Sequence, residues 1–86
     1  MKLIVCVVRD AAADVYGRPF FAVATGEAIR SFTDEVNRNA ADNIMAKHPQ
    51  DFELFELGHY NDEDATLDVG VPRSLIRGSD AVIKTN

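Results

Sequence analysis

The sequence predicts an α+β fold, with a mainly antiparallel sheet of three to five strands and one principal amphipathic helix on one face. Three observations support this prediction. One segment has a strong helical period, several short segments have the apolar or alternating pattern of strands, and strands and helices do not alternate regularly along the chain. With 86 residues, we expect a single domain, residues 1–86, with one modest core.

The first expected strand covers residues 2–9, KLIVCVVR, and is apolar on both of its faces. Such a strand belongs in the centre of a sheet, and both sides of it need cover. Residues 10–18 contain Gly17 and precede Pro19, which predicts a loop. A second, short strand follows at residues 20–23.

The principal helix is expected to begin at Thr25, as its N-cap, with Glu27 in the first turn, where the helix dipole favours a carboxylate. The residues expected on its apolar face are Ile29, Phe32, Val36 and Ala40. On the polar face Arg30, Asp34 and Arg38 are spaced four residues apart, so we expect them to pair with one another. A short turn of helix is expected through residues 44–46, ended by His48-Pro49.

The second half of the chain predicts a hairpin. Residues 52–60 form one strand, residues 61–64 an acidic turn, and residues 65–71 an alternating strand. After it, Pro72 is expected to open a helical turn that ends at Gly78. Residues 81–84 are a last strand or a frayed tail.

The helix covers only one face of this sheet. We expect the C-terminal segment or an oligomer partner to cover the other face, and in a chain of 86 residues a second copy is the attractive solution. The sequence therefore predicts a homo-oligomer, with a homodimer as the simplest case.

Composition and charge limit the class of protein. Apolar residues make up 47% and charged residues 27%, with no long apolar stretch, so neither a disordered chain nor a membrane protein is expected. The net charge of -5 excludes a uniformly basic protein that coats nucleic acid. Cys6 is the only cysteine, and the apolar run around it is too short for a secretion signal, so we expect a cytoplasmic protein without disulfides.

No motif predicts catalysis. His48 and His59 lack a second ligand at metal-site spacing, and the turn at residues 61–64 lacks the glycine and glutamate of a calcium loop. No phosphate-binding glycine pattern or activated nucleophile is visible. We expect a non-enzymatic protein that has no metal ion and no cofactor.

The last 14 residues are locally basic, with three basic residues against one acid, Asp80. If the protein contacts nucleic acid, Arg73, Arg77 and Lys84 are the candidates for phosphate contact, with Arg73 and Arg77 one helical turn apart. Arg18 and Tyr16 in the loop are candidate helpers, since base stacking on an aromatic ring favours single strands. The alternative interpretation is a charged, solvated tail without a binding role.

Two stretches of the chain, residues 18–37 (RPFFAVATGEAIRSFTDEVN) and residues 48–68 (HPQDFELFELGHYNDEDATLD), resemble the small nonstructural protein of gokushovirus-type microviruses, which are tailless phages with circular single-stranded DNA genomes. The matched elements are Phe20 and Phe21, Ala28-Ile29-Arg30, Phe32, Val36-Asn37, His48-Pro49, Asp51 and Leu54 to Gly58. Arg30 stands out because it is matched although it lies on the polar face of the helix, which adds it to the candidate nucleic-acid contacts.

The resemblance implies a phage accessory protein in the cytoplasm of the infected bacterial host. Members of the family are often described as DNA-binding and are thought to act in the shift from duplex replication to packaging of single-stranded DNA. The first hypothesis is therefore a protein that binds single-stranded DNA or the phage or host proteins that replicate and package it. The alternative is an interaction or assembly factor whose acidic body binds basic proteins and does not contact DNA.

Overall fold

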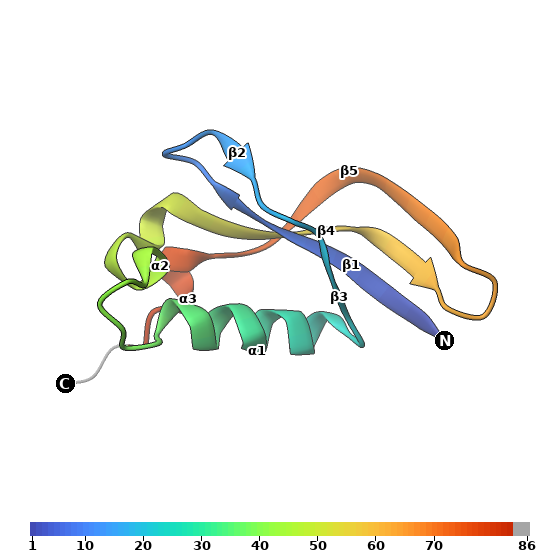
Figure 1. Ribbon diagram of the computed structural model, residues 1–86, viewed down its shortest axis with the longest axis horizontal. Coiled ribbons are helices and arrows are strands. Elements are labelled where there is room, and N and C mark those ends of the chain that lie inside the picture. Colours follow the sequence, from blue (N-terminus) through green and yellow to red (C-terminus); the bar gives the residue numbers. More distant parts are fainter. Residues whose placement is uncertain (84–86) are drawn as a thin grey trace.

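The computed structural model describes residues 1–83 and has the predicted α+β architecture (Figure 1). Its elements in chain order are β1 (Lys2–Asp10), β2 (Val15–Tyr16), β3 (Phe20–Ala22), α1 (Thr25–Val36), α2 (Ile44–Lys47), the 3-10 helix η1 (Pro49–Asp51), β4 (Phe52–Asn61), β5 (Thr66–Arg77) and α3 (Gly78–Ala81). The five strands form one antiparallel sheet in the order β2-β1-β4-β5, and β3 pairs with β1 beside β2. The prediction of a mainly antiparallel sheet with one principal helix is confirmed.

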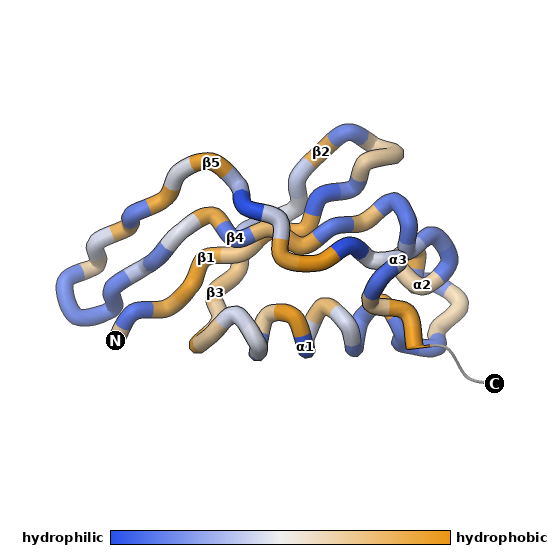
Figure 2. The backbone as a smooth tube through the Cα atoms, turned by 180° about the vertical axis from the view of Figure 1, so that it is seen from behind, coloured by the Kyte–Doolittle hydropathy of each residue, from blue (hydrophilic) through white to orange (hydrophobic). Residues whose placement is uncertain are grey.

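Strand β1 lies in the centre of the sheet, as its apolar faces predict. It pairs with β4 along one edge and with β2 and β3 along the other. Figure 2 shows its hydrophobic stretch running through the middle of the molecule. One face of β1, with Ile4 and Cys6, packs with Phe32 and Val36 of α1 into the main core, and Leu54 of β4 completes its centre. The core therefore lies between the sheet and α1.

The ends and the polar face of α1 differ in detail from the prediction. The N-cap is Ala24, which makes no side-chain cap hydrogen bond, so the expected capping by Thr25 is wrong. Glu27 lies in the first turn as expected, and its carboxylate accepts a hydrogen bond from the Val23 N–H at 3.4 Å. Arg38 pairs with Glu35, one turn earlier, at 2.9 Å and not with Asp34 as predicted.

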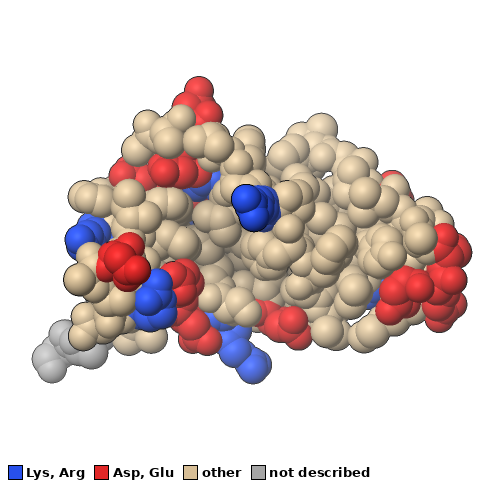
Figure 3. Space-filling model, in the orientation of Figure 1, with Lys and Arg blue, Asp and Glu red and all other residues tan. Residues whose placement is uncertain are grey.

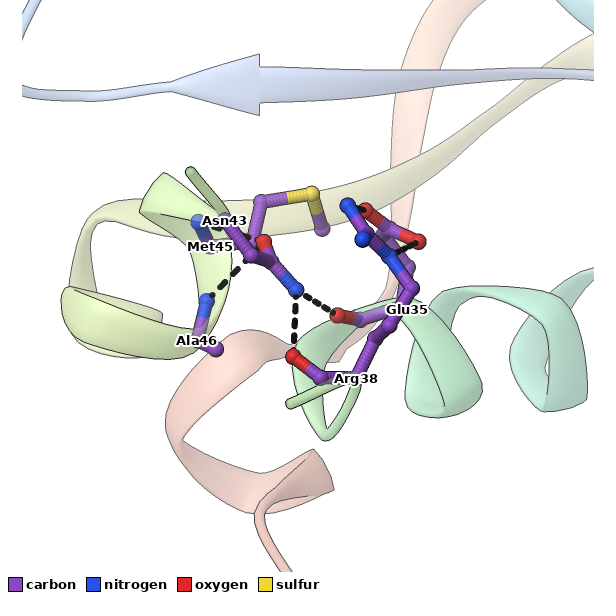
Figure 4. A network of polar contacts seen from close by, with 5 residues as sticks. All are labelled: Glu35, Arg38, Asn43, Met45 and Ala46. Carbon is purple, nitrogen blue, oxygen red and sulfur yellow. Dashed lines mark hydrogen bonds and ion pairs between the residues drawn. The ribbon is translucent and has the colours of Figure 1, made fainter. Parts of the chain in front are cut away.

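Asn43 connects the end of α1 to α2 and is the one buried polar residue of the described chain, with 3% of its surface exposed. Its side-chain N–H groups donate to the carbonyl oxygens of Glu35 and Arg38 at 2.7 and 2.9 Å. Its Oδ1 accepts from the backbone N–H groups of Met45 and Ala46 at the start of α2 (Figure 4). One side chain thus satisfies free backbone groups at two helix ends, and the predicted turn of helix through residues 44–46 is confirmed.

The segment after the hairpin was predicted incorrectly. Residues 72–77, expected as a helical turn opened by Pro72, continue β5, and Gly78 begins α3 where it was expected to end a helix. Pro72 fits in a strand because it lies where β5 is out of register with β4, so no ladder hydrogen bond needs its missing N–H. A last strand or frayed tail was expected at residues 81–84. Residues 82 and 83 form no strand, and Lys84 lies outside the described residues.

The C-terminal segment packs on the α1 side of the sheet. Ala81 belongs to the core with α1, and Asn37 at the end of α1 donates to the Ala81 carbonyl at 2.9 Å. The backbone N–H of Ile83 in turn donates to Asn37 at 2.9 Å. This part of the C-terminal segment therefore does not cover the opposite face, which was one of the two predicted solutions.

The expected loop at residues 10–18 contains a short strand. Val15 and Tyr16 form β2 and pair with Asp10 and Arg9 at the end of β1. The tight turn is completed by Asp10, whose side chain accepts from two backbone N–H groups, and by Asp14 at a positive φ of 56°. This strand places Tyr16 on the sheet and not in a free loop.

Candidate nucleic-acid interface on the open face of the sheet

Within residues 1–83, no helix lies on the side of the sheet that faces away from α1 (Figure 1). We call this side the open face. Because residues paired across neighbouring strands share a face, the register assigns its members. They are Leu3, Val5, Val7 and Arg9 of β1, Tyr16 of β2, Phe21 of β3, Glu53, Phe55, Gly58 and Tyr60 of β4, and Leu67, Val69, Ser74 and Arg77 of β5.

The open face begins with a polar row at one end. Tyr16, Arg9, Glu53 and Arg77 are consecutive partners across β2, β1, β4 and β5. The Arg9 guanidinium lies 5.8 Å from the centre of the Tyr16 ring, the geometry of a cation-π contact. One row of the sheet thus presents an aromatic ring and two guanidinium groups.

Two aromatic pairs lie beyond this row. Tyr16 meets Phe55 edge to face, with ring centres 5.7 Å apart, and Phe21 packs on Tyr60 at 5.2 Å. Tyr16 is 46% and Phe21 53% exposed, while Phe55 and Tyr60 are half-buried. In each pair one ring supports another ring that is open to a planar ligand.

The charge of the polar row is close to balanced. Arg9 also pairs with Asp14 at 2.7 Å, and Glu53 accepts a hydrogen bond from Ser74. A hollow of about 120 Å³ between Arg9 and Arg77 is lined by Glu53 and Asp51 as well. An anion on this row therefore meets both signs of charge, and the aromatic rings provide the larger binding surface.

The charges elsewhere are distributed unevenly. In the view of Figure 3, one end of the molecule carries a cluster of acidic side chains, while the other acidic side chains are scattered together with Lys and Arg. That end is the tip of the β4–β5 hairpin, where Asp62, Glu63 and Asp64 are exposed. The Met1 amino group pairs with Asp62 at 2.7 Å and with Glu63 at 3.1 Å, and these contacts raise the pKa of that amino group.

The structure separates the six residues predicted to contact nucleic acid. Tyr16 and Arg77 lie in the polar row, and Arg18 is exposed on the link between β2 and β3. Arg30 is exposed on α1, whose buried side packs against the opposite face of the sheet. Arg73 lies on the other face of the sheet. Lys84 lies outside the described residues.

Arg73 belongs to the helix side of the sheet. It is the register partner of Glu56, which is paired with Cys6 of the core face, and its guanidinium contacts the Glu56 carboxylate at 2.8 Å. The Glu56 side chain is only 13% exposed, so its carboxylate needs a partner of opposite charge. Arg73 therefore acts mainly by pairing with this carboxylate.

Four residues that bring a ring or a guanidinium group to the open face were not predicted as contacts: Arg9, Phe21, Phe55 and Tyr60. The alternation of β1 already places Arg9 on the same face as Val5 and Val7, so its position on the open face could have been predicted from the sequence. The aromatic pairs had no such signal, because they join residues of different strands and depend on the register.

Other chemistry finds little support in residues 1–83. No group of three or more His, Cys, Asp and Glu side chains in this range is arranged to hold a metal ion. Cys6 is fully buried, and burial raises the pKa of its thiol to about 11, with a smaller contribution from the carboxylate of Glu56. No helix in the same range is long and apolar enough to cross a membrane.

Comparison with known families gives one match. A family model described as Phage ORF5 protein matches residues 3–81. The matched range includes all of the helices and, apart from Lys2, the whole sheet. No curated protein and no solved structure matches the chain.

Proposed function

We propose, because this chain belongs to the Phage ORF5 protein family, that it is a non-enzymatic accessory protein of a gokushovirus-type microvirus. In this proposal it acts in the cytoplasm of the infected bacterial host, during replication and packaging of the single-stranded genome. It does so by binding single-stranded DNA on the open face of its sheet. The resemblance of residues 18–37 and 48–68 to the nonstructural protein of these phages supports the choice of phage and process.

One observation carries the proposed mode of binding. Tyr16 and Phe21 expose half of their surface on one sheet face, each supported by a second ring, and Arg9 and Arg77 lie in the row at the end of that face. Unpaired bases stack on such rings whatever their sequence, and guanidinium groups contact the phosphates between them. A duplex hides its base faces, so the same surface favours single strands.

Binding of this kind is modest in strength. Stacking contributes about 1 to 3 kcal/mol per base, and two exposed rings engage two bases. Arg18 and Arg77 can contact phosphates directly, and Arg9 can do so by exchanging its ion pair with Asp14 for a phosphate. With about 0.7 counterions released per phosphate, three contacts give an expected slope of log K against log salt of about -2. The net charge of -5 opposes the approach of DNA and keeps the affinity low at physiological salt.

The test is fluorescence anisotropy with a labelled single-stranded oligonucleotide over a series of salt concentrations. We expect saturable binding at low salt, a slope near -2, and much weaker binding of the same sequence as a duplex. The double variant Tyr16→Ala and Phe21→Ala is expected to lose about tenfold or more in affinity with an unchanged slope. No binding of single strands at low salt would refute the proposal.

The second candidate function is that of an interaction or assembly factor that does not contact DNA. The acidic hairpin tip with Asp62, Glu63 and Asp64 favours it, because this surface is suited to a basic phage or host protein. Charge reversal at Glu63 distinguishes the two functions. Of the two acids that pair with the Met1 amino group, Asp62 and Glu63, it is the more exposed. The reversal is expected to weaken capture of a basic replication or packaging protein and to leave DNA binding unchanged or stronger.

A further inference from the structure

The open face exposes more apolar surface than base stacking needs. Beyond the aromatic pairs, Leu67 is 57% and Val69 48% exposed on β5, next to half-buried Leu3 and Tyr60. Aliphatic side chains on a sheet face are typical of contact with another protein surface and have no role in base stacking. This part of the open face therefore calls for a protein partner.

One arginine of the polar row, Arg77, lies in β5, and the acidic tip with Asp62, Glu63 and Asp64 lies beyond the other end of the same strand. Within residues 1–83 Arg77 forms no ion pair, whereas Arg9 is paired with Asp14. A second copy of the chain, turned by 180° about an axis across the strands, lays its β5 over β5 in the opposite direction and so brings its acidic tip to Arg77 of the first copy. The same rotation brings Arg77 of the second copy to the first copy's tip.

The rows of the open face also match under this rotation. With the axis at the row of Phe21, Val5, Gly58 and Val69, that row meets itself in the partner. The neighbouring row of Val7, Phe55 and Ser74 then faces the partner's row of Leu3, Tyr60 and Leu67. Apolar groups therefore meet along β1 and β4, while Ser74 meets Leu67 along β5.

We infer that the open face is the interface of a homodimer with two-fold symmetry, in which two copies pack face to face with their strands antiparallel. The sheet and α1 are stacked along the 26 Å dimension of the molecule (Figure 1), so the open face spans at most 46 by 20 Å, which is comparable with the roughly 800 Å² per partner of a standard stable interface. The interface is isologous, and each of its charge contacts occurs twice.

A consequence follows if the proposed function is correct. The second copy and single-stranded DNA use the same rings, Tyr16 and Phe21, so the two occupants compete. The dimer holds the rings covered, and DNA binding requires its dissociation. The observed affinity for DNA is then reduced as the protein concentration rises above the dissociation constant of the dimer.

Sedimentation velocity of the full chain over a concentration series tests the dimer. We expect a monomer–dimer equilibrium in the micromolar range. Leu67→Lys is expected to give a monomer with an unchanged circular dichroism spectrum, because Leu67 is exposed and contributes little to the monomer's own core. A wild-type chain that stays monomeric up to several hundred micromolar overturns the inference.

A charge swap tests the antiparallel arrangement. Arg77→Glu places acidic groups of the two copies together and is expected to weaken the dimer at least tenfold. Adding Glu63→Lys to Arg77→Glu is expected to restore it, whereas Arg30→Glu on the helix side leaves it unchanged. If the double variant is as weak as Arg77→Glu alone, the arrangement is wrong.

The same centrifuge run with an oligothymidylate distinguishes the inference from the proposed function. Dissociation to a complex of one chain with one oligonucleotide supports the competition. A dimer that keeps its mass while it binds DNA overturns the competition. A dimer that does not bind DNA at low salt refutes the proposed function and the competition, and leaves the homodimer supported.

Discussion

Arg73 and Arg77 lie on opposite faces of the sheet, although only three residues separate them. Arg73 is paired in register with Glu56 and Arg77 with Glu53, and Leu75 is an additional residue between their strand positions. This irregularity shifts the alternation of β5 by one residue, so that Arg77 joins the open face and Arg73 the helix side. The two arginines therefore have different roles.

Single substitutions of these two arginines are expected to give different results. In the proposed mode of DNA binding, Arg77→Ala removes a phosphate contact and is expected to reduce the salt slope of single-strand binding by about 0.7. Arg73→Ala leaves the slope unchanged but lowers the free energy of unfolding by about 1 kcal/mol, because the carboxylate of Glu56 loses its partner. Anisotropy titrations and urea unfolding of both variants measure these effects, and equal loss of slope in both would contradict the assignment of faces.

Asn43→Ala is expected to lower the free energy of unfolding by about 2 to 4 kcal/mol. The substitution leaves the carbonyl oxygens of Glu35 and Arg38 without their partner and removes the cap of α2. Urea denaturation followed by circular dichroism measures the change. Asn39→Ala, at an exposed position nearby, is the control and is expected to stay within about 0.5 kcal/mol of the wild type.

Gly58→Ala is expected to cost more than about 1 kcal/mol of stability. Gly58 has a φ of 154°, and a β-carbon there would collide with the backbone of Asp68 and Val69 in β5. Gly70→Ala is the matched control in the neighbouring strand, because a β-carbon at that position meets no atom within 4 Å. The difference between the two melting temperatures tests the prediction, and it fails if both variants melt together.

The stability of the fold is expected to fall as the pH rises from about 8.5, the ordinary pKa of an unfolded thiol. The pKa of Cys6 in the folded chain is raised to about 11, so between these values the unfolded state loses the thiol proton and the folded state keeps it. Cys6→Ala removes this part of the pH dependence. Urea midpoints of both proteins at pH 7 and pH 10.5 measure it, and parallel decline in both would show that other groups are responsible.

The sequence was sufficient where one residue pattern determines one element. The apolar run of β1, the start of α1 and the strand β4 were predicted close to their observed bounds, and the hairpin was predicted with the correct turn, although β5 extends six residues beyond its predicted end. In these segments burial of a regular apolar stripe is the dominant free energy, and periodicity reports it directly.

The prediction was wrong where tertiary pairing overrides local preference. Pro72 and Gly78 have the spacing of a short helix, but β4 provides a strand partner up to Arg77 that an isolated segment lacks. Of the candidate site, Tyr16 and Arg77 lie on the open face. Arg73 was grouped with Arg77 because a helical turn was expected there, and the strand with its irregular register places the two on opposite faces. The dimer and the DNA contact stay predictions.

The hydrogen bonds of Asn37 to Ala81 and Ile83 have a practical consequence for labelling. They hold this part of the chain at the end of α1, on the far side of the sheet from Tyr16 and Phe21 (Figure 1). A fluorophore or tether attached at position 82, where the Val82 side chain is 37% exposed, starts from there. Immobilisation through this position is therefore suited to surface-based measurements, because the matrix is kept away from the rings that are proposed to bind DNA.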